Sequence, residues 1–370
     1  MKIWKYKRLS ECSNFVSERT SNIAIDNYIS TENMIENRGG VKEAAALPDV
    51  KSTSAYKPND ILLSNIRPYF CKIWFADKKG SCSNDVLVVR AKKEVDPKFL
   101  YYVLSDQNFF NWDSMTSKGT KMPRGTPNAI MKYSVPDLPF HTQQKIASIL
   151  SAYDNLIQNY KKQIEALQTA ASELYKEWFV RFRFPRYQTT KFENGIPKGW
   201  KVEKLGTLAN ISTGKCNRED AEEDGIYPLF DRSQEIKKSN EWIKDCEAII
   251  VPGEGTSFIP RYYKGKFNLH QRCYCVEPKY PNFGKFLFYV LMLNRKYFLS
   301  VATGATVPSL RYNNFASMKF VLPEMSLCNN FNKIADDIFA KVDNLQQQIT
   351  NLTQQRDLLL PRLMSGKLEI

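Results

Sequence analysis

Two loops of this 370-residue sequence gather side chains that can hydrogen-bond to phosphates and to the edges of bases. Residues 117–128 are rich in Gly and Pro, and their basic and amide side chains include Lys118, Lys121, Arg124 and Asn128. A matching stretch later in the chain offers Thr303, Thr306, Ser309 and Arg311. Arginine pairs well with guanine and asparagine with adenine, and all these groups bind phosphate oxygens. The alternative is a pair of glycine-rich turns with solvated charges.

A second set of polar side chains lies near apolar runs that have the length of β-strands. Asn65 and Arg67 directly follow the run Asp60-Ile-Leu-Leu-Ser64. The basic residues that flank the matching region of the second half are Lys215, Arg218 and Arg232. We take these residues as further candidates for contact with a nucleic acid.

The charge balance favours an anionic partner. The sequence has 53 Lys and Arg against 39 Asp and Glu, a net charge of +14, and most of the surplus lies in the two globular halves and the segment between them. A polyanion such as DNA is the economical partner for such a chain. Charge that serves only solubility is the alternative.

Signatures of catalysis and of metal binding are weak. The sequence has no Gly-x-x-x-x-Gly-Lys-Ser/Thr loop and no Asn-Pro-Pro-Tyr tetrapeptide, and it holds only two histidines, His141 and His270. The stretch His270-x-x-Cys273-x-Cys275 lacks the usual spacing of zinc ligands. Two Glu-x-Lys pairs, beginning at Glu235 and Glu277, are no more than chance supplies. We therefore expect a chain with no catalytic site, no metal and no cofactor of its own.

The elements that position the candidate loops come from a tandem duplication. Lys98-Phe-Leu-Tyr-Tyr-Val-Leu104 recurs as Lys285-Phe-Leu-Phe-Tyr-Val-Leu291. Gly119-x-x-x-Pro123 recurs as Gly304-x-x-x-Pro308, and Trp4-Lys-x-x-Arg-Leu9 as Trp200-Lys-x-x-Lys-Leu205. The order is the same in both halves, and the period is the size of a domain. Arg124-Gly-Thr-Pro is the one stretch of the first loop that looks like an insertion relative to the second.

A long helix is predicted at the end of each copy. In the first copy an apolar seam advances by alternating steps of four and three residues: Ile146, Leu150, Tyr153, Ile157, Tyr160, Ile164, Leu167, Ala171, Leu174 and Trp178. In the second copy it contains Phe331, Ile334, Ile338, Val342, Leu345, Ile349, Leu352, Arg356, Leu359 and Leu363, with a stutter between Ile338 and Val342. Such heptads are typical of a coiled coil, although an ordinary helix bundle also shows apolar stripes. We expect Pro185 to end the first helix.

The pattern predicts an α+β protein with two tandem globular domains, each followed by a long helix, and with the two helices paired. The predicted ranges are a first recognition domain at 1–142, a central spacer helix at 143–184, a linker at 185–200, a second recognition domain at 201–325 and a C-terminal spacer helix at 326–370.

Several of these motifs together resemble the specificity (S) subunit of type I restriction–modification enzymes. They include the Trp-Lys starts, the Gly-x-x-x-Pro loops, Leu174-Tyr-Lys-Glu-Trp-Phe-Val-Arg-Phe-Arg-Phe-Pro185, Leu363-Met-Ser-Gly-Lys-Leu368, Tyr28-Ile-Ser-Thr-Glu-Asn33 and Ser83-Asn-Asp85. The resemblance spans the whole chain, in the family's order.

The resemblance implies a non-catalytic DNA-binding subunit. Each globular domain would recognise one half of a bipartite sequence in double-stranded DNA, and the two helices would pack antiparallel as a spacer. Two methyltransferase (modification) subunits would bring S-adenosylmethionine, and restriction/translocase subunits would bring ATP and Mg. The place of action would be the cytoplasm, without a membrane. Two alternatives remain open on the residues alone: a coiled-coil scaffold and a fused DNA-modifying enzyme.

Overall fold

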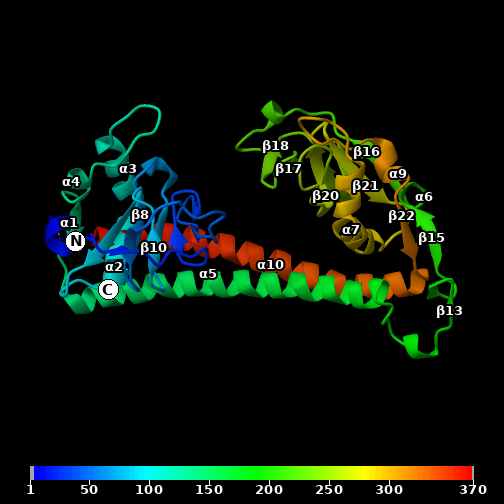
Figure 1. Ribbon diagram of the computed structural model, residues 1–370, viewed down its shortest axis with the longest axis horizontal. Coiled ribbons are helices and arrows are strands. Elements are labelled where there is room, and N and C mark those ends of the chain that lie inside the picture. Colours follow the sequence, from blue (N-terminus) through cyan, green and yellow to red (C-terminus); the bar gives the residue numbers. More distant parts are fainter. Residues whose placement is uncertain (1–3, 369–370) are drawn as a thin grey trace. The chain divides into compact units, whose positions relative to one another are not determined.

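The computed structural model describes residues 4–368, and the chain divides into two compact units. Unit 1 comprises residues 1–160 and 347–370, and unit 2 comprises residues 161–346. Residues 1–3 and 369–370, which begin and end the predicted ranges, lie outside the described residues. Two long helices, α5 (Phe140–Tyr175) and α10 (Met325–Met364), each contribute to both units (Figure 1).

The core of unit 1 is a four-stranded antiparallel sheet in the order β2-β11-β8-β9. Its strands are β2 (Ser13–Phe15), β8 (Ile61–Ser64), β9 (Ile73–Phe75) and β11 (Val86–Ala91). The helices of the unit are α1 (Leu9–Cys12), η1 (Pro68–Phe70), α2 (Pro97–Ser105), α3 (Gln107–Thr116) and α4 (Pro127–Ile130). Strands β1 (Tyr6–Arg8) and β12 (Ser134–Pro136) pair separately.

Short strands between β2 and β11 complete unit 1. A second sheet has the order β3-β7-β10-β4, and β5 pairs with β6. The bounds are β3 (Arg19–Thr20), β4 (Tyr28–Ile29), β5 (Met34–Ile35), β6 (Gly40–Val41), β7 (Thr53–Tyr56) and β10 (Gly80–Cys82).

Unit 2 repeats this plan with a longer sheet in the order β16-β21-β19-β20-β17-β18. Its strands are β16 (Ala209–Thr213), β17 (Tyr227–Phe230), β18 (Ile236–Ser239), β19 (Lys244–Pro252), β20 (Arg261–Leu269) and β21 (Cys273–Pro278). Around them lie β15 (Lys201–Lys204), α6 (Leu205–Leu208), η4 (Arg218–Asp220), α7 (Gly284–Leu293), α8 (Arg295–Val301), α9 (Tyr312–Ala316) and β22 (Lys319–Leu322). The four neighbouring strands β16-β21-β19-β20 of this sheet correspond one by one to β2-β11-β8-β9 of unit 1, so the structure confirms the duplication.

Both faces of each core sheet are covered, and this explains why the predicted strands are continuous apolar runs. In β8, Ile61 and Leu63 join one hydrophobic cluster and Leu62 joins another. In β19, Ile249 faces one cluster and Ile250 the other. A strand buried on both faces has no polar alternation.

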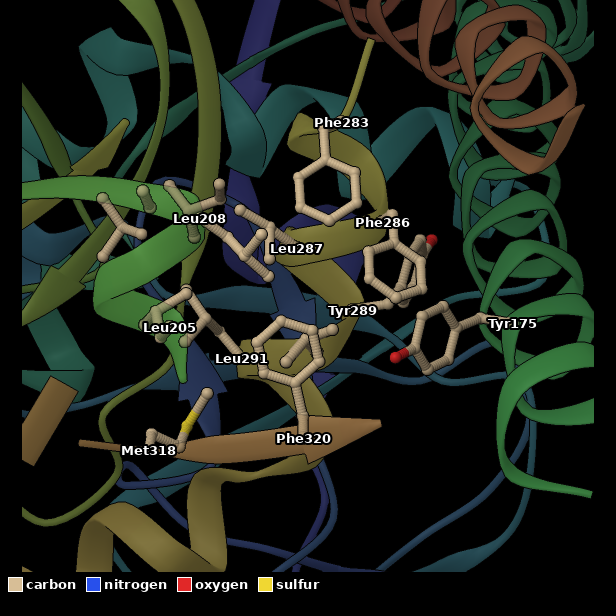
Figure 2. Close-up of a cluster of buried hydrophobic side chains, with 14 of the residues drawn as sticks. Tyr175, Leu205, Leu208, Phe283, Phe286, Leu287, Tyr289, Leu291, Met318 and Phe320 are labelled. Carbon is tan, nitrogen blue, oxygen red and sulfur yellow. The ribbon is translucent and has the colours of Figure 1, made fainter. Parts of the chain in front are cut away.

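The two helices supply part of each core. In unit 2, Tyr175 of α5 packs its ring 5.6 Å from that of Phe286 and 5.5 Å from that of Tyr289, both on α7 (Figure 2). The Tyr175 ring also lies 5.7 Å from that of Phe331 on α10. In unit 1, Leu150 of α5 and Leu360 of α10 belong to the same buried cluster as α2. The globular part of each unit therefore packs against both helices.

The helices are antiparallel, as predicted. Asp154 of α5 contacts Arg356 of α10 within unit 1, whereas Tyr175 of α5 contacts Phe331 of α10 within unit 2. Residue numbers therefore rise along one helix as they fall along the other.

Burial confirms the apolar seam of α5, in which every predicted residue is buried or half-buried. In α10 the assignment of Ile334 to the seam is wrong, because 41% of this residue is exposed, whereas Ala335 is only 1% exposed. Ala335 follows Phe331 by four residues and therefore shares its face of the helix. With Ala335 in the seam the steps alternate without interruption, and the predicted stutter disappears.

The end of α5 also differs from the prediction. After Tyr175 the chain continues as a π-helical segment, η2 (Lys176–Val180), and turns away at Phe182 with φ 58°, before Pro185. Aromatic packing explains this early end, because the rings of Phe179, Phe182 and Phe184 all lie within 6.1 Å of the ring of Trp200. The connection to β15 contains η3 (Tyr187–Thr189), β13 (Phe192–Glu193) and β14 (Ile196–Pro197).

Arg356, the one polar residue on either seam, is held by a specific network in unit 1. Its Nη1 donates to Asp154 Oδ1 at 2.8 Å, and the Tyr102 hydroxyl donates to Asp154 Oδ2 at 2.6 Å. The Arg356 side chain is 18% exposed and that of Asp154 is 23% exposed. The network thus ties α2 to both helices.

We predict that Arg356→Ala lowers the free energy of unfolding of unit 1 by about 2–4 kcal/mol, because it leaves Asp154 half-buried without its cation. Urea denaturation, combined with hydrogen exchange of unit 1 amides, measures the loss. Arg362→Ala, at an exposed position in the last turn of the same helix, is the control and should cost at most about 0.5 kcal/mol. Equal losses in the two variants would contradict a structural role for this ion pair.

Candidate nucleic-acid interface

Three segments of unit 1 meet beyond the end of its core sheet: the turn after β8, the turn before β11 and the loop between α3 and α4. The Asn65 amide donates to the Asp85 carbonyl at 2.8 Å, and the Gly125 amide donates to the Asn65 carbonyl at 3.0 Å. The Arg67 amide donates to the Pro123 carbonyl at 2.8 Å. These backbone bonds fix the loop against both turns.

Unit 2 joins its equivalent segments by the same three bonds. The Gly253 amide donates to the Arg272 carbonyl at 2.8 Å, and the Leu310 amide donates to the Gly253 carbonyl at 2.7 Å. The Gly255 amide donates to the Pro308 carbonyl at 3.0 Å. Gly255 has φ 126°, and its counterpart Arg67 also adopts positive φ, at 51°. The backbone of the edge is therefore duplicated together with the sheet.

Each loop is closed by a reciprocal pair of backbone bonds. Lys118 and Arg124 bond each other at 2.9 and 2.8 Å, and Thr303 and Ser309 do so at 3.0 and 2.8 Å. The residue after the first position of each pair is a glycine with positive φ, 99° at Gly119 and 125° at Gly304. A left-handed residue is required there in both loops.

This register corrects the expectation that Arg124-Gly-Thr-Pro is an insertion. Arg124 corresponds to Ser309, whereas Arg311 corresponds to Thr126, since Thr126 and Arg311 are the N-cap residues of α4 and α9. Arg124-Gly-Thr-Pro is therefore not an insertion, because the two loops have equal length up to these caps. The register stays equal beyond the caps, because the Leu9 amide donates to the Tyr133 carbonyl in unit 1 and the Leu205 amide donates to the Met318 carbonyl in unit 2.

Two further turns join the edge of unit 2. The Gln271 amide donates to the Cys216 carbonyl at 2.9 Å, and the His270 amide donates to the Phe230 carbonyl at 2.9 Å. These bonds bring Lys215 and Arg218 on one side, and Arg232 on the other, next to the turn before β21. The structure thus gathers candidate residues that are far apart in sequence.

The candidate side chains differ in exposure. The exposed ones are Lys118, Lys121, Arg124, Asn128, Lys215, Arg218, Arg232, Thr303, Thr306 and Arg311, and the half-buried ones are Asn65, Arg67 and Ser309. Asn128 lies on α4 and outside the closed loop. Arg124 Nη1 forms an ion pair with Asp85 Oδ1 at 2.9 Å, which links the loop to the turn before β11 by side chains as well.

Asn65 has a buried amide oxygen beneath the loop. Its Oδ1 and both carboxylate oxygens of Asp113, on α3, are buried and have no hydrogen-bond partner among the described residues. A Cβ added to Gly125 would lie 2.5 Å from Asp113 Oδ1 and 2.9 Å from Asn65 Oδ1, so only glycine fits above them. The Asn65 amide oxygen thus lies under the loop, where it cannot accept a bond from DNA in this conformation.

Burial raises the pKa of the Asp113 carboxyl to about 7. Asp113 itself is 0% exposed. The neutral acid is therefore the favoured form below neutral pH, and it carries a proton that a hydrogen bond can use.

Sequence reasoning missed three residues of this edge: Arg272, Glu254 and Asp113. Arg272 occupies the position of Asp85, and Glu254 accepts from both Arg232 and Arg272. Alignment of the segments that precede β11 and β21 would place Arg272 at the position of Asp85. Nothing in the sequence marks Glu254 or Asp113, because their partners are distant in the chain.

Neither a metal site nor a membrane span is found in the described part of the chain. No cluster of three or more His, Cys, Asp or Glu side chains there has the arrangement of metal ligands. No helix within residues 4–368 is both long and apolar enough to cross a membrane.

A family model described as the type I restriction modification DNA specificity domain matches residues 1–169 and 197–357. The chain belongs to the specificity subunits of type I restriction–modification enzymes. The MjaIX specificity subunit of Methanocaldococcus jannaschii is 26% identical to it over 316 residues, which cover 75% of this chain and 71% of the relative. The HindI specificity subunit of Haemophilus influenzae is 22% identical and is matched over 100% of both chains.

A solved structure supports the fold. The S subunit of a type I restriction–modification system from M. genitalium superposes with a TM-score of 0.62 at 18% identity, over 98% of this chain and 96% of that chain. The protein is accordingly a DNA sequence-specificity subunit with two recognition domains and no catalytic activity of its own.

We predict that Asp113→Asn stabilises unit 1 above neutral pH. In the unfolded chain the carboxyl ionises near pH 4, whereas in the fold it keeps its proton up to about pH 7. The contribution of this group to stability therefore falls as the pH rises from about 4 to 7 and is constant above. Asparagine does not ionise, so the variant should not show this decrease in the free energy of unfolding. In the wild type the decrease amounts to at most about 4 kcal/mol at pH 8.

Urea denaturation at pH 5 and pH 8 tests this pH dependence. Asp113→Asn should raise the midpoint mainly at pH 8. Asp77→Asn, at an exposed position of the same unit, serves as the control and should leave the pH profile unchanged. A parallel profile for wild type and Asp113→Asn would show that the buried carboxyl does not titrate with folding.

Proposed function

We propose that the two edges of turns and loops bind the two halves of a bipartite double-stranded DNA sequence, one half per recognition domain. The observation that carries this proposal is the set of three backbone bonds repeated in both units, which fixes a loop and two turns with exposed cationic and polar side chains. We assign the recognition domains to residues 1–142 and 201–325, the linker to 185–200 and the spacer helices to 143–184 and 326–370.

The assigned DNA contacts follow from exposure. Phosphate contact suits the flexible cations, which are Lys118, Lys121, Lys215 and Arg218. Base contact suits Arg124, Thr303 and Ser309, whose backbone closes the loops, and Arg311 at the N-cap of α9. Arg67, Asn128, Arg232 and Thr306 complete the set, and Asn65 contributes through its backbone.

The partners and cofactors belong to the same proposal. Two methyltransferase subunits would dock on this chain and bring S-adenosylmethionine, and restriction/translocase subunits would bring ATP and Mg. The assembly would act on DNA in the cytoplasm. A coiled-coil scaffold without DNA affinity is the competing function, and salt-dependent binding of DNA by the chain distinguishes the two.

We predict that replacement of residues 1–142 by the corresponding domain of another specificity subunit changes one half of the recognised sequence and leaves the other intact. Both spacer helices stay in place, so the replacement must retain apolar side chains against Leu150 and Leu360. Mapping of methylated adenines in cells that carry the hybrid complex measures both halves. A change in both halves would mean that the domains do not act independently.

We also predict that the helices set the gap between the two half-sites. Insertion of four residues after Gln163, about one turn at ~1.5 Å per residue, should alter the preferred gap by about one or two base pairs and leave both half-sites intact. Insertion of two residues should disrupt the seam and reduce folding. Selection from DNA with random spacers decides the matter: an unchanged gap with full affinity in the four-residue variant would rule out the helices as spacers.

A further inference from the structure

Glu254 lies at the centre of the recognition edge of unit 2, in the turn after β19. Its Oε2 accepts from Arg232 Nη1 at 2.8 Å, and its Oε1 accepts from Arg272 Nη1 at 2.7 Å. The Glu254 side chain is only 14% exposed. Its backbone forms a bridge with Ser309 of the closed loop. One carboxylate therefore holds two arginines that come from two different turns.

Each arginine keeps most of its donors available. Arg232 and Arg272 use Nη1 alone in these bonds, and their side chains are 47% and 54% exposed. A guanidinium has five N–H donors in a rigid plane, so the Nε and Nη2 side of each group still offers a two-donor fork. Such a fork matches the O6 and N7 acceptors of guanine in the major groove.

The carboxylate favours a base over a phosphate as the target of this pair. It removes one unit of positive charge from the two arginines and adds a negative group that repels phosphate. It also fixes the two long side chains before binding, which reduces the entropy lost when a directional contact forms. Lys215 and Arg218, on the neighbouring turn, form no ion pair among the described residues and keep their full charge for phosphates.

Unit 1 builds a related ion pair from different positions. There Asp85 holds Arg124 of the loop, whereas in unit 2 the counterpart of Asp85 is Arg272 and the counterpart of Arg124 is Ser309. The arginine side chains of the two units therefore project from different positions of an equivalent backbone. The two domains are thus suited to different half-sites.

We propose that Arg232 and Arg272, held by Glu254, recognise guanine in the DNA half-site of unit 2. This inference rests on the proposed function of the edge. Glu254 acts as a positioning residue, and the two arginines determine the specificity.

The test uses the full chain assembled with its methyltransferase subunits and selects bound sequences from DNA randomised in both half-sites. The wild type should select guanine at one or two positions of one half-site. Arg272→Ala and Arg232→Ala should each reduce the preference for guanine at a position by about 10-fold or more, and the other half-site should stay unchanged. Arg272→Lys should weaken the preference, because lysine keeps the charge and can still donate to guanine but lacks the rigid two-donor fork.

Glu254→Gln separates positioning from charge. It makes the edge more positive, so non-specific affinity should stay equal or rise while the preference for guanine falls. Lys201→Ala, at an exposed position of β15, removes one charge outside the core sheet and should leave the selected sequence unchanged.

Three results overturn the inference. Both arginine-to-alanine variants could weaken binding to all sequences equally, which would assign the arginines to phosphates. They could leave the selected sequence unchanged, or Arg272→Lys could keep the full guanine preference. A wild-type complex that selects no sequence in either half-site would instead refute the proposed function itself.

Discussion

Each unit completes its hydrophobic core with segments of both long helices, and in unit 1 the segment of α10 comes from the far end of the chain. Leu360 and Leu363, near the end of the chain, are buried in the cluster that contains Leu9 and Leu100 of unit 1. Likewise Ala171 and Tyr175 lie in the cluster formed by the β-strands and helices of unit 2. Both helices are therefore part of the core of each unit, and the core sheet of each unit packs against them.

The turns and loops at the edge of each unit satisfy one another's backbone groups. Turns and loops without regular structure leave amides and carbonyls that must find partners when they are half-buried. Here the three segments of each edge bond to one another, as in the amide of Gly125 with Asn65 and that of Leu310 with Gly253. Side chains on such an edge start from fixed backbone positions, which limits the entropy lost on binding.

Much of this architecture could be predicted from the sequence, because it follows from strong periodic signals. The helices and the strand at Ile61 follow from apolar patterns, and the duplication follows from motifs that recur in the same order. The errors arose where a weak signal competed with a stronger one. Ile334 is larger than Ala335 and was preferred for the seam, although the helix geometry places the alanine inside.

The loops at the edge of each unit could be found in the sequence, but the side-chain pairs that connect them to the neighbouring turns could not. The Gly-x-x-x-Pro motif marks both loops, but the apparent insertion Arg124-Gly-Thr-Pro hides the register, in which the backbone matches Arg124 with Ser309. The pairing of Glu254 with Arg232 and Arg272 depends on three turns that meet only in the folded sheet. Asp113 carries no sequence signal, since its role depends on the absence of a Cβ at Gly125.

The comparison of the two edges separates what maintains the fold from what distinguishes one target from another. Backbone bonds at positions 65, 67 and 125 are repeated at 253, 255 and 310 although the residue types differ at every one of these positions. Side-chain charge, by contrast, is reversed at one pair of equivalent positions, which is Asp85 in unit 1 and Arg272 in unit 2. A bond made by the backbone tolerates substitution, whereas an ion pair depends on both side chains. Divergence after the duplication could therefore change the recognised bases through side-chain pairs while the edge kept its shape.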